Sequence, residues 1–243
     1  MEINTIAACL AVAFIAGLIH ASLGMGYGMI AMATLTLFIP YNQAAAIVSA
    51  NLLILVIQIS ISLREYIDWK GIAAPSLSLL AFKIIGIVLM MRLQSNVLRI
   101  ALGVFLIVYS SMQLFHVKML QIKGSKTQGI VLCGIGGLFG GVFNVSGPFA
   151  SIYCQAKYGE DPKKYAANMN AIFVPSAIAA IIMHICYGNF TTEGYIGSAI
   201  MIAGILIATY LGVGIIKRIN PKRLRALSYL YIIIMGITIC ISA

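Results

Sequence analysis

The first apolar segment of the chain runs into Gly17-Leu18-Ile19-His20-Ala21-Ser22-Leu23-Gly24-Met25-Gly26-Tyr27-Gly28, and a related stretch follows 120 residues later. The second copy reads Gly137-Leu138-Phe139-Gly140-Gly141-Val142-Phe143-Asn144-Val145-Ser146-Gly147-Pro148. The spacing Gly86-x5-Arg92-x6-Arg99 likewise returns as Gly212-x5-Arg218-x6-Arg225, 126 residues later. Duplicated hydrophobic units with glycine-rich breaks at corresponding places are typical of repeat-built transporters. Because lipid cannot hydrogen-bond irregular backbone, each break must line a cavity or lie buried in protein.

The composition fixes the class of protein. Of 243 residues, 61% are hydrophobic and 9% are charged, whereas a soluble domain has about 25% charged residues. We therefore expect one polytopic membrane domain and no enzyme. The net charge of +10 is interpreted as a topology signal in loops rather than a nucleic-acid surface. Five scattered cysteines without a CxxC pair predict neither a disulfide framework nor a metal site, and no cofactor is expected.

Each half of the chain contains five hydrophobic segments. They span 4–23, 28–39, 43–63, 71–91 and 97–115 in repeat one (1–115), and 127–143, 148–158, 165–187, 194–216 and 223–242 in repeat two (127–243), with a polar linker at 116–126. Twelve residues of helix rise about 18 Å, against about 30 Å of hydrocarbon. Segments one and two of each repeat are therefore predicted to form a broken or re-entrant hairpin, followed by three transmembrane helices. Whether 28–39 and 148–158 cross or re-enter stays open.

The basic residues predict the orientation. In either case the hairpin returns the chain to the side it came from, so each repeat makes an odd net number of crossings and the second repeat is inverted. If the loops 64–70, 116–126, 157–164 and 217–225 share one side, they hold 13 of the 16 Lys and Arg residues. The opposite side then holds only Arg92 and Arg99. The positive-inside rule makes the richer side cytoplasmic and places both termini outside.

Lys83 is the remaining basic residue, and it lies in the middle of segment 71–91. A lysine at the centre of a transmembrane helix costs about 2.5–3.5 kcal/mol on insertion scales. All six acidic residues fall in loops or at the terminus, so no carboxylate close in sequence can pair with it. An anionic ligand that binds and leaves is the functional interpretation. The alternative is a lysine that snorkels to the outer interface.

The two breaks are the second candidate for an anion site. A turn that opens a half-helix presents free N–H groups and the positive end of the helix dipole. The predicted contributors are Gly24 and Gly26 in the first break, and Asn144, Ser146 and Gly147 in the second. Close helix packing through small-xxx-small spacing is the structural alternative.

Polar side chains also recur at equivalent positions in the third segments. Asn51 and Asn170 lie 119 residues apart, and each is either a buried, structurally hydrogen-bonded amide or part of the anion path. His20 and His184 are the side chains of the apolar segments that titrate near neutral pH. Each is a candidate for proton coupling, with a packing role as the alternative.

At these residues the chain resembles the sulfite exporter TauE/SafE family of membrane permeases. The two quoted breaks, the stretch 45–53 and the helices around Gly86 and Gly212 carry the resemblance, which spans nearly the whole chain. It implies transport of sulfur-containing anions, such as sulfite and organosulfonates, across the bacterial inner membrane. Asn144, Ser146 and Pro148 stand where the family usually has glycine, so the implied substrate is a sulfur anion as a class rather than sulfite itself.

The sequence thus predicts an exporter of small sulfur anions that works by alternating access, with the anion held at two broken-helix turns near the midplane. Its expected partners are the small anion and the lipid bilayer, and a homodimer is compatible with the sequence. Two rival functions remain. One is an anion channel, and the other is a membrane thiol–disulfide carrier, which needs intramembrane cysteines at repeat-equivalent positions. Cys133 and Cys154 correspond to Ala13 and Thr34, so that symmetry is missing.

Overall fold

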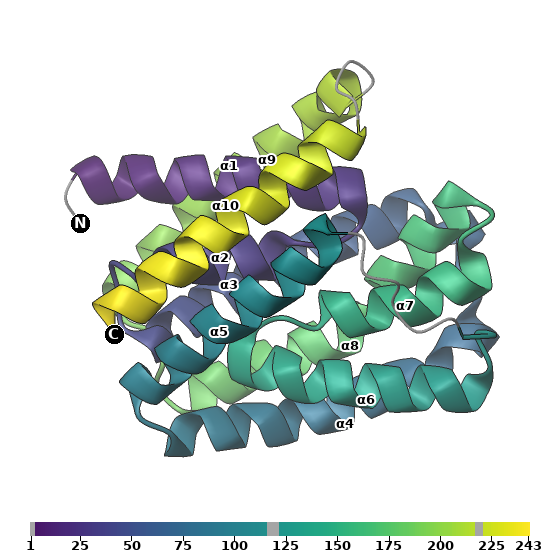
Figure 1. The fold of residues 1–243 in the computed structure, drawn as a ribbon, viewed down its shortest axis with the longest axis horizontal. Helices are drawn as coiled ribbons and strands as arrows, with labels where there is room; N and C mark the ends of the chain where they lie inside the picture. The colour runs from purple at the N-terminus through teal and green to yellow at the C-terminus, as the bar shows by residue number, and fades with distance from the viewer. Residues whose placement is uncertain (1–2, 116–121, 217–220) are drawn as a thin grey trace. The chain divides into compact units, whose positions relative to one another are not determined.

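The computed structural model is all-helical, and it describes residues 3–115, 122–216 and 221–243 (Figure 1). The described residues form ten α-helices and one 3-10 helix, with no strand among them. In chain order the elements are α1 (Ile3–Leu23), α2 (Tyr27–Leu35), α3 (Tyr41–Ser62), η1 (Arg64–Tyr66), α4 (Trp69–Arg92), α5 (Ser95–Leu114), α6 (Lys126–Phe143), α7 (Gly147–Tyr158), α8 (Pro162–Cys186), α9 (Thr192–Ile216) and α10 (Pro221–Ser242). The predicted all-α class is confirmed.

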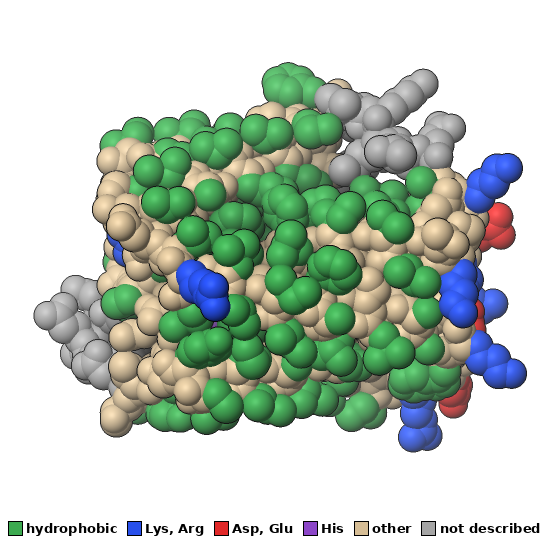
Figure 2. Space-filling view, turned by 90° about the horizontal axis from the view of Figure 1, so that it is seen from below, with side chains coloured by type: hydrophobic (Ala, Val, Ile, Leu, Met, Phe, Trp, Pro, Cys, Tyr) green, Lys and Arg blue, Asp and Glu red, His purple; other side chains and the backbone are tan. Residues whose placement is uncertain are grey.

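Five of these helices are long and apolar enough to cross a membrane: α3, α4, α5, α6 and α8. Shorter apolar stretches lie in α1 (Cys9–Ala21), α9 (Gly194–Ala208) and α10 (Ala226–Ser242). Hydrophobic side chains are spread over the face drawn in Figure 2, and many large apolar side chains are exposed. A surface of this kind suits lipid rather than water, so the chain is a multi-pass membrane protein.

Both predicted breaks interrupt helices. Between α1 and α2, Gly24 and Gly26 have φ values of 73° and 113°, a region that glycine enters without steric cost. Between α6 and α7, Asn144 takes the left-handed conformation with φ 57°, which asparagine tolerates better than most residues. At nine and 12 residues, α2 and α7 rise about 14 and 18 Å and are each too short to span the hydrocarbon.

The chain divides into two compact units, and each unit draws on both sequence repeats. Unit 1 comprises Met1–Asn51, Leu93–Val117 and Asn189–Ala243, and unit 2 comprises Leu52–Arg92 and Lys118–Gly188. The boundary falls inside α3, directly after Asn51. The predicted division into repeat one, linker and repeat two stays a prediction, and the two compact units each combine helices from both predicted repeats.

In unit 2, α4 and α6 lie side by side (Figure 1). Glycines allow their backbones to approach closely. A Cβ atom built on Gly86 would lie 2.5 Å from the carbonyl oxygen of Leu138 and 2.8 Å from the Cα of Gly141. Gly137 and Gly141 face the backbone of Leu79 and Lys83 in the same way. Interfaces between membrane helices favour such small residues, because van der Waals packing replaces the hydrophobic effect there.

In unit 1, the main helix pairs are α1 with α9 and α5 with α10. A Cβ on Gly17 would lie 3.7 Å from the Cα of Ile205. Gly17 and Ile205 are the repeat equivalents of Gly137 and Leu79, at offsets of 120 and 126 residues. α1 is thus the repeat equivalent of α6, and α9 is the repeat equivalent of α4. The contact between α1 and α9 therefore corresponds to the contact between α6 and α4. This pairing fits a duplicated unit, and the inverted orientation of the repeats stays a prediction.

Candidate functional site

Lys83 is buried in unit 2, with 2% of its surface exposed. Its neighbours Phe82 and Ile85 are exposed by 44% and 54%, so α4 turns its apolar side outward and its lysine inward. A snorkelling lysine would extend along the outside of the protein to the interface, and Lys83 does not. Among the described residues, it forms no ion pair and no side-chain hydrogen bond.

Two elements of unit 2 meet α4 around Lys83. The carbonyl of Lys83 faces Gly141 of α6, and Gly141 lies three residues before the helix break at Asn144. His184 of α8 is buried and close enough to interact electrostatically with Lys83. A buried cation beside a second titratable group, with no acidic partner, is typical of a functional position within a membrane.

The second break, between α6 and α7, has a defined backbone conformation. The N–H of Asn144 donates to the carbonyl of Gly140 at 3.1 Å, which ends α6 with a left-handed cap. The Ser146 side chain lies directly against Gly140, where a Cβ atom would collide with its Oγ. Asn144 and Ser146 are both buried, at 5% and 7% exposure. Polar side chains from the turn therefore lie inside the protein.

α7 begins directly at this break. Gly147 and Phe149 are in its first turn, where backbone N–H groups have no intrahelical acceptor. Pro148, between them, has no N–H to leave unsatisfied. Pro148 therefore occupies a position where a missing donor costs nothing, and the start of α7 keeps the geometry of an anion-binding helix terminus.

Gly24 and Gly26, the predicted residues of the first break, belong to unit 1. Gly26 precedes α2, and every residue of α2 is buried. In the turn itself Gly24 is buried, and Met25 and Gly26 are half-buried. His20, in the last turn of α1, is 1% exposed. The roles of Gly24, Gly26 and His20 in binding or proton coupling stay predictions.

Asn51 and Asn170 make the same contact in their respective helices. Asn51 donates from Nδ2 to the carbonyl of Ile47 at 2.8 Å, and Asn170 donates to the carbonyl of Ala166 at 2.8 Å. Both asparagines are fully buried. The Oδ1 of Asn51 has no hydrogen-bond partner among the described residues. The shared hydrogen bond supports a structural role for the two amides. At Asn51 the buried Oδ1 remains as an acceptor without a donor among the described residues.

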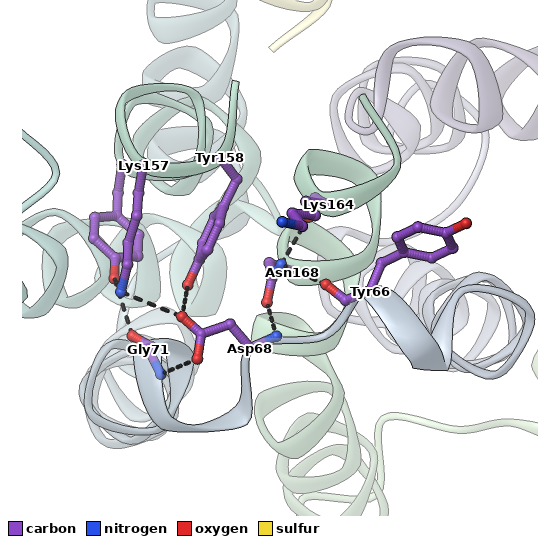
Figure 3. Close-up of polar contacts among 8 residues, drawn as sticks. Tyr66, Asp68, Gly71, Lys157, Tyr158, Lys164 and Asn168 are labelled. Atoms are coloured by element: carbon purple, nitrogen blue, oxygen red, sulfur yellow. Dashed lines mark hydrogen bonds and ion pairs between the residues drawn. The ribbon is translucent and has the colours of Figure 1, made fainter. Parts of the chain in front are cut away.

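A polar cluster that the sequence did not reveal joins three elements of unit 2 (Figure 3). Asp68 accepts hydrogen bonds from the N–H of Gly71 at 2.9 Å and from the hydroxyl of Tyr158 at 3.0 Å. The Nζ of Lys157 lies 3.6 Å from the same carboxylate. Asn168 accepts from the N–H of Asp68 at 2.8 Å and, through its Nδ2, donates to backbone carbonyls. The loops 64–70 and 157–164, predicted to share one side of the membrane, therefore lie together.

A proline explains part of this cluster. Pro75 lies inside α4 and has no N–H to donate to the carbonyl of Gly71, four residues earlier. Tyr153 of α7 donates its hydroxyl to that carbonyl at 3.0 Å, and Lys157 contacts the Tyr153 hydroxyl at 3.3 Å. α7, the short helix after the second break, is thus hydrogen-bonded to α4 one turn before Pro75. The spacing of Gly71 and Pro75 was the available sequence signal, since it predicts a carbonyl that needs an outside donor.

The cluster should make stability depend on pH. The hydrogen bond from Gly71 lowers the pKa of Asp68 below its ordinary value, opposed by burial and helped by Tyr158 and Lys157. A carboxyl whose folded pKa is depressed stabilises the protein above about pH 4, and this contribution is lost as the pH falls through the folded pKa. The side chain is 44% exposed, so the contribution is about 1 kcal/mol or less.

We therefore expect Asp68→Asn to lower the melting temperature slightly at pH 7, and the difference from wild type to vanish as the pH falls toward 3. Thermal unfolding in detergent measures it. Glu160→Gln, an exposed acid in the same region, is the control and should not change the pH profile. A difference that persists at low pH would show that the carboxylate charge does not contribute.

The cysteines are the residues on which the rival thiol–disulfide carrier depends. All five are free thiols. Cys133 and Cys154 are buried on α6 and α7 of unit 2. In the described part of the chain, no group of three or more His, Cys, Asp or Glu side chains could hold a metal ion.

Comparison with known proteins decides the family. The family model for the sulfite exporter TauE/SafE matches residues 9–239. The chain belongs to this family. The chain is also 25% identical over 231 residues to the "Probable sulfite/organosulfonate exporter TauE" of Cupriavidus necator, covering 90% of this chain and 88% of that protein. No solved structure matches. Membership of an exporter family, together with the apolar helices, makes the protein a membrane transporter.

Proposed function

We propose that this protein exports small sulfur-containing anions, such as sulfite or organosulfonates, across the bacterial inner membrane by alternating access between inverted repeats. The family and the relative from Cupriavidus necator support this substrate class, because both are named for sulfite or organosulfonate export. The proposed site lies in unit 2, where Lys83 supplies the charge, and Asn144, Ser146 and Gly147 supply donors at the second break. Asn170, Gly24, Gly26 and Asn51 are further candidates.

The observation that carries the proposal is the burial of Lys83. A lysine that is 2% exposed and has no carboxylate partner among the described residues is costly in a membrane. An anion that binds there would neutralise the charge, and its release would restore the unfavourable state.

The second break complements this charge. Sulfite and sulfonates carry several oxygen acceptors, and they need donors around the whole group. The N–H groups in the first turn of α7, which have no acceptor within the helix, and the buried Asn144 amide are donors of this kind. Gly141 holds the backbone of α4 against α6 one turn before the break, which keeps the lysine and the donors within one compact unit.

The membrane potential sets the favoured direction. An inside-negative potential favours the exit of an anion by about 2.3 kcal/mol per charge per 100 mV. Export therefore needs no coupling ion. Proton coupling through His20 or His184 is a further candidate. His184 has the stronger support, because it interacts electrostatically with Lys83.

Thermal unfolding of the detergent-purified protein tests the substrate class. The panel is sulfite, thiosulfate, sulfate, sulfoacetate, taurine and chloride at equal ionic strength. We expect saturable stabilisation by a sulfur anion, because a ligand that binds only the folded state raises the melting temperature with its concentration. Equal responses to all anions, or none, would contradict the proposal.

Replacing all five cysteines distinguishes the proposed anion transporter from the rival thiol–disulfide carrier. A thiol–disulfide carrier requires its thiols, whereas the proposed anion transporter does not. We expect the cysteine-free protein to keep its anion flux. Loss of flux with retained folding would favour the redox rival instead.

A further inference from the structure

A groove of about 770 Å³ lies in unit 2, apart from the residues of the proposed anion site. The end of α3, the segment through η1 to the first two turns of α4, and α8 around Pro175 form its walls. The walls are mainly aliphatic and include Ile57, Ile72, Leu77 and Val174. A small, strongly hydrated anion gains nothing from such a lining, so the groove is suited to a hydrocarbon ligand.

The groove also has a basic and an aromatic residue in its lining. Arg64 and Trp69 line the groove, and Trp69 is 65% exposed. Among the described residues, Arg64 forms no ion pair and no side-chain hydrogen bond. Arginine binds phosphate in a bidentate manner, and tryptophan is enriched at the membrane–water interface. A ligand with an anionic head and an apolar body fits this distribution of charge.

A buried hydroxyl adds an independent observation. Ser60 lines the groove two residues before the end of α3, and its Oγ is buried with no hydrogen-bond partner in the described part of the chain. Buried hydroxyls are rarely left unpaired, because desolvation without a hydrogen bond is costly. Ser60 is in the last turn of α3, and Arg64 begins η1 directly after that helix. A ligand held by both residues therefore needs an acceptor for the Ser60 hydroxyl next to its anionic group.

We propose that this groove binds one anionic phospholipid. Its phosphate contacts Arg64, an ester carbonyl accepts from Ser60, and an acyl chain occupies the aliphatic part of the groove. The glycerophospholipid matches the order of these contacts, because its ester carbonyls lie between the phosphate and the chains. The loop that contains Arg64 is on the predicted cytoplasmic side, where anionic lipids attract basic side chains.

Native mass spectrometry and thermal unfolding of the whole detergent-purified protein test the site. The probes are phosphatidylglycerol and phosphatidylcholine with identical acyl chains. We expect one phosphatidylglycerol to be retained and to raise the melting temperature saturably, and phosphatidylcholine to bind more weakly. Arg64→Gln should weaken phosphatidylglycerol binding about fivefold, the loss of one basic contact near the surface. Ser60→Ala should weaken both lipids.

Two matched controls separate this site from general lipid contact. Arg92→Gln removes an exposed arginine at the other end of α4 and should leave binding unchanged. Ala73→Phe fills the groove, which Ala73 lines, and should displace the lipid, whereas Ala81→Phe changes an exposed residue of α4 outside the groove and should not.

Several outcomes would overturn the inference. Equal retention of the two lipids would remove the role of the headgroup charge. Equal effects of Arg64→Gln and Arg92→Gln would remove the role of this arginine. A dimer that dissociates in Ala73→Phe would show that a second copy occupies the groove. Each variant that retains the anion response of the wild type is folded, so failure here is distinguishable from failure of the proposed transport function.

Discussion

Lys83→Met is expected to abolish binding of the transported anion while making the empty protein more stable. Methionine keeps the length of the side chain and removes the charge. Loss of a buried charged partner weakens binding by at least about 3 kcal/mol, or more than about 100-fold in Kd. Removing an uncompensated lysine from the membrane core stabilises the protein by about 2–3 kcal/mol. Sulfite binding and thermal unfolding without anion measure the two effects.

The opposite signs of these effects make the test specific. A lysine with only a packing role would lower stability when it is replaced, and it would leave anion affinity intact. Lys70→Met, in the first turn of the same helix and exposed, is the matched control and should change neither quantity. Lys83→Arg keeps the charge in a larger head group, and we expect it to retain part of the affinity. Unchanged binding in Lys83→Met would exclude Lys83 from the site.

Gly86→Val should give the largest loss of folded protein. The new Cβ would lie 2.5 Å from the Leu138 carbonyl oxygen and 2.8 Å from the Gly141 Cα, and both are backbone atoms that no rotamer change can move away. α4 and α6 must then separate along their closest contact. Overpacking of a rigid interface costs about 1–3 kcal/mol, and we expect about 3 kcal/mol or more here because the backbones touch. Folded yield and melting temperature measure it.

An exposed position on α4 provides the control for this change. Ala81→Val adds the same two γ-methyl groups at an exposed residue and should leave the yield close to wild type. Gly86→Ala should have an intermediate effect, because it adds the same Cβ without the two methyl groups. A Gly86→Val protein that folds as well as Ala81→Val would contradict the close packing of α4 against α6.

The sequence predicts most of the helical framework because uncharged apolar segments and glycine breaks carry strong signals. The segment predicted at 71–91 is α4 at 69–92, and that predicted at 127–143 is α6 at 126–143. The segment predicted at 28–39 is a shorter helix that ends at Leu35. Residues 36–38 form turns, although Leu37 and Phe38 are apolar. Hydrophobicity alone does not mark where a helix that is buried on all sides must end.

The predicted residues of the anion site divide between the two units. Lys83, Asn144, Ser146, Gly147, Asn170 and His184 belong to unit 2, whereas His20, Gly24, Gly26 and Asn51 belong to unit 1. Sequence reasoning found Lys83 because a charge inside an apolar segment stands out. It could not place α6 against α4 or bring His184 near Lys83, since these contacts depend on which helices become neighbours. The repeated Gly-Arg motif includes Arg218 and Arg225, and those side chains lie outside the described residues.

The Asp68 cluster was missed for a different reason. Asp68, Lys157 and Tyr158 are ordinary loop and helix-end residues when each is considered alone. Their contacts arise because Pro75 frees the carbonyl of Gly71 and Tyr153 supplies a donor to it. A search of the apolar segments for prolines finds Pro75, whose missing N–H leaves the carbonyl four residues earlier without its helical donor. That carbonyl indicates that α4 needs a hydrogen-bond donor from another element at this point.

The most direct test of the central claim is the electrical current from proteoliposomes after a jump in sulfite concentration. The proteoliposomes contain wild type, Lys83→Met or Lys70→Met at matched protein density. We predict a current that saturates with sulfite concentration in wild type and Lys70→Met, and no current in Lys83→Met. A current that rises linearly without saturation would indicate a channel, and an undiminished current in Lys83→Met would contradict the assignment of the buried lysine to the anion path.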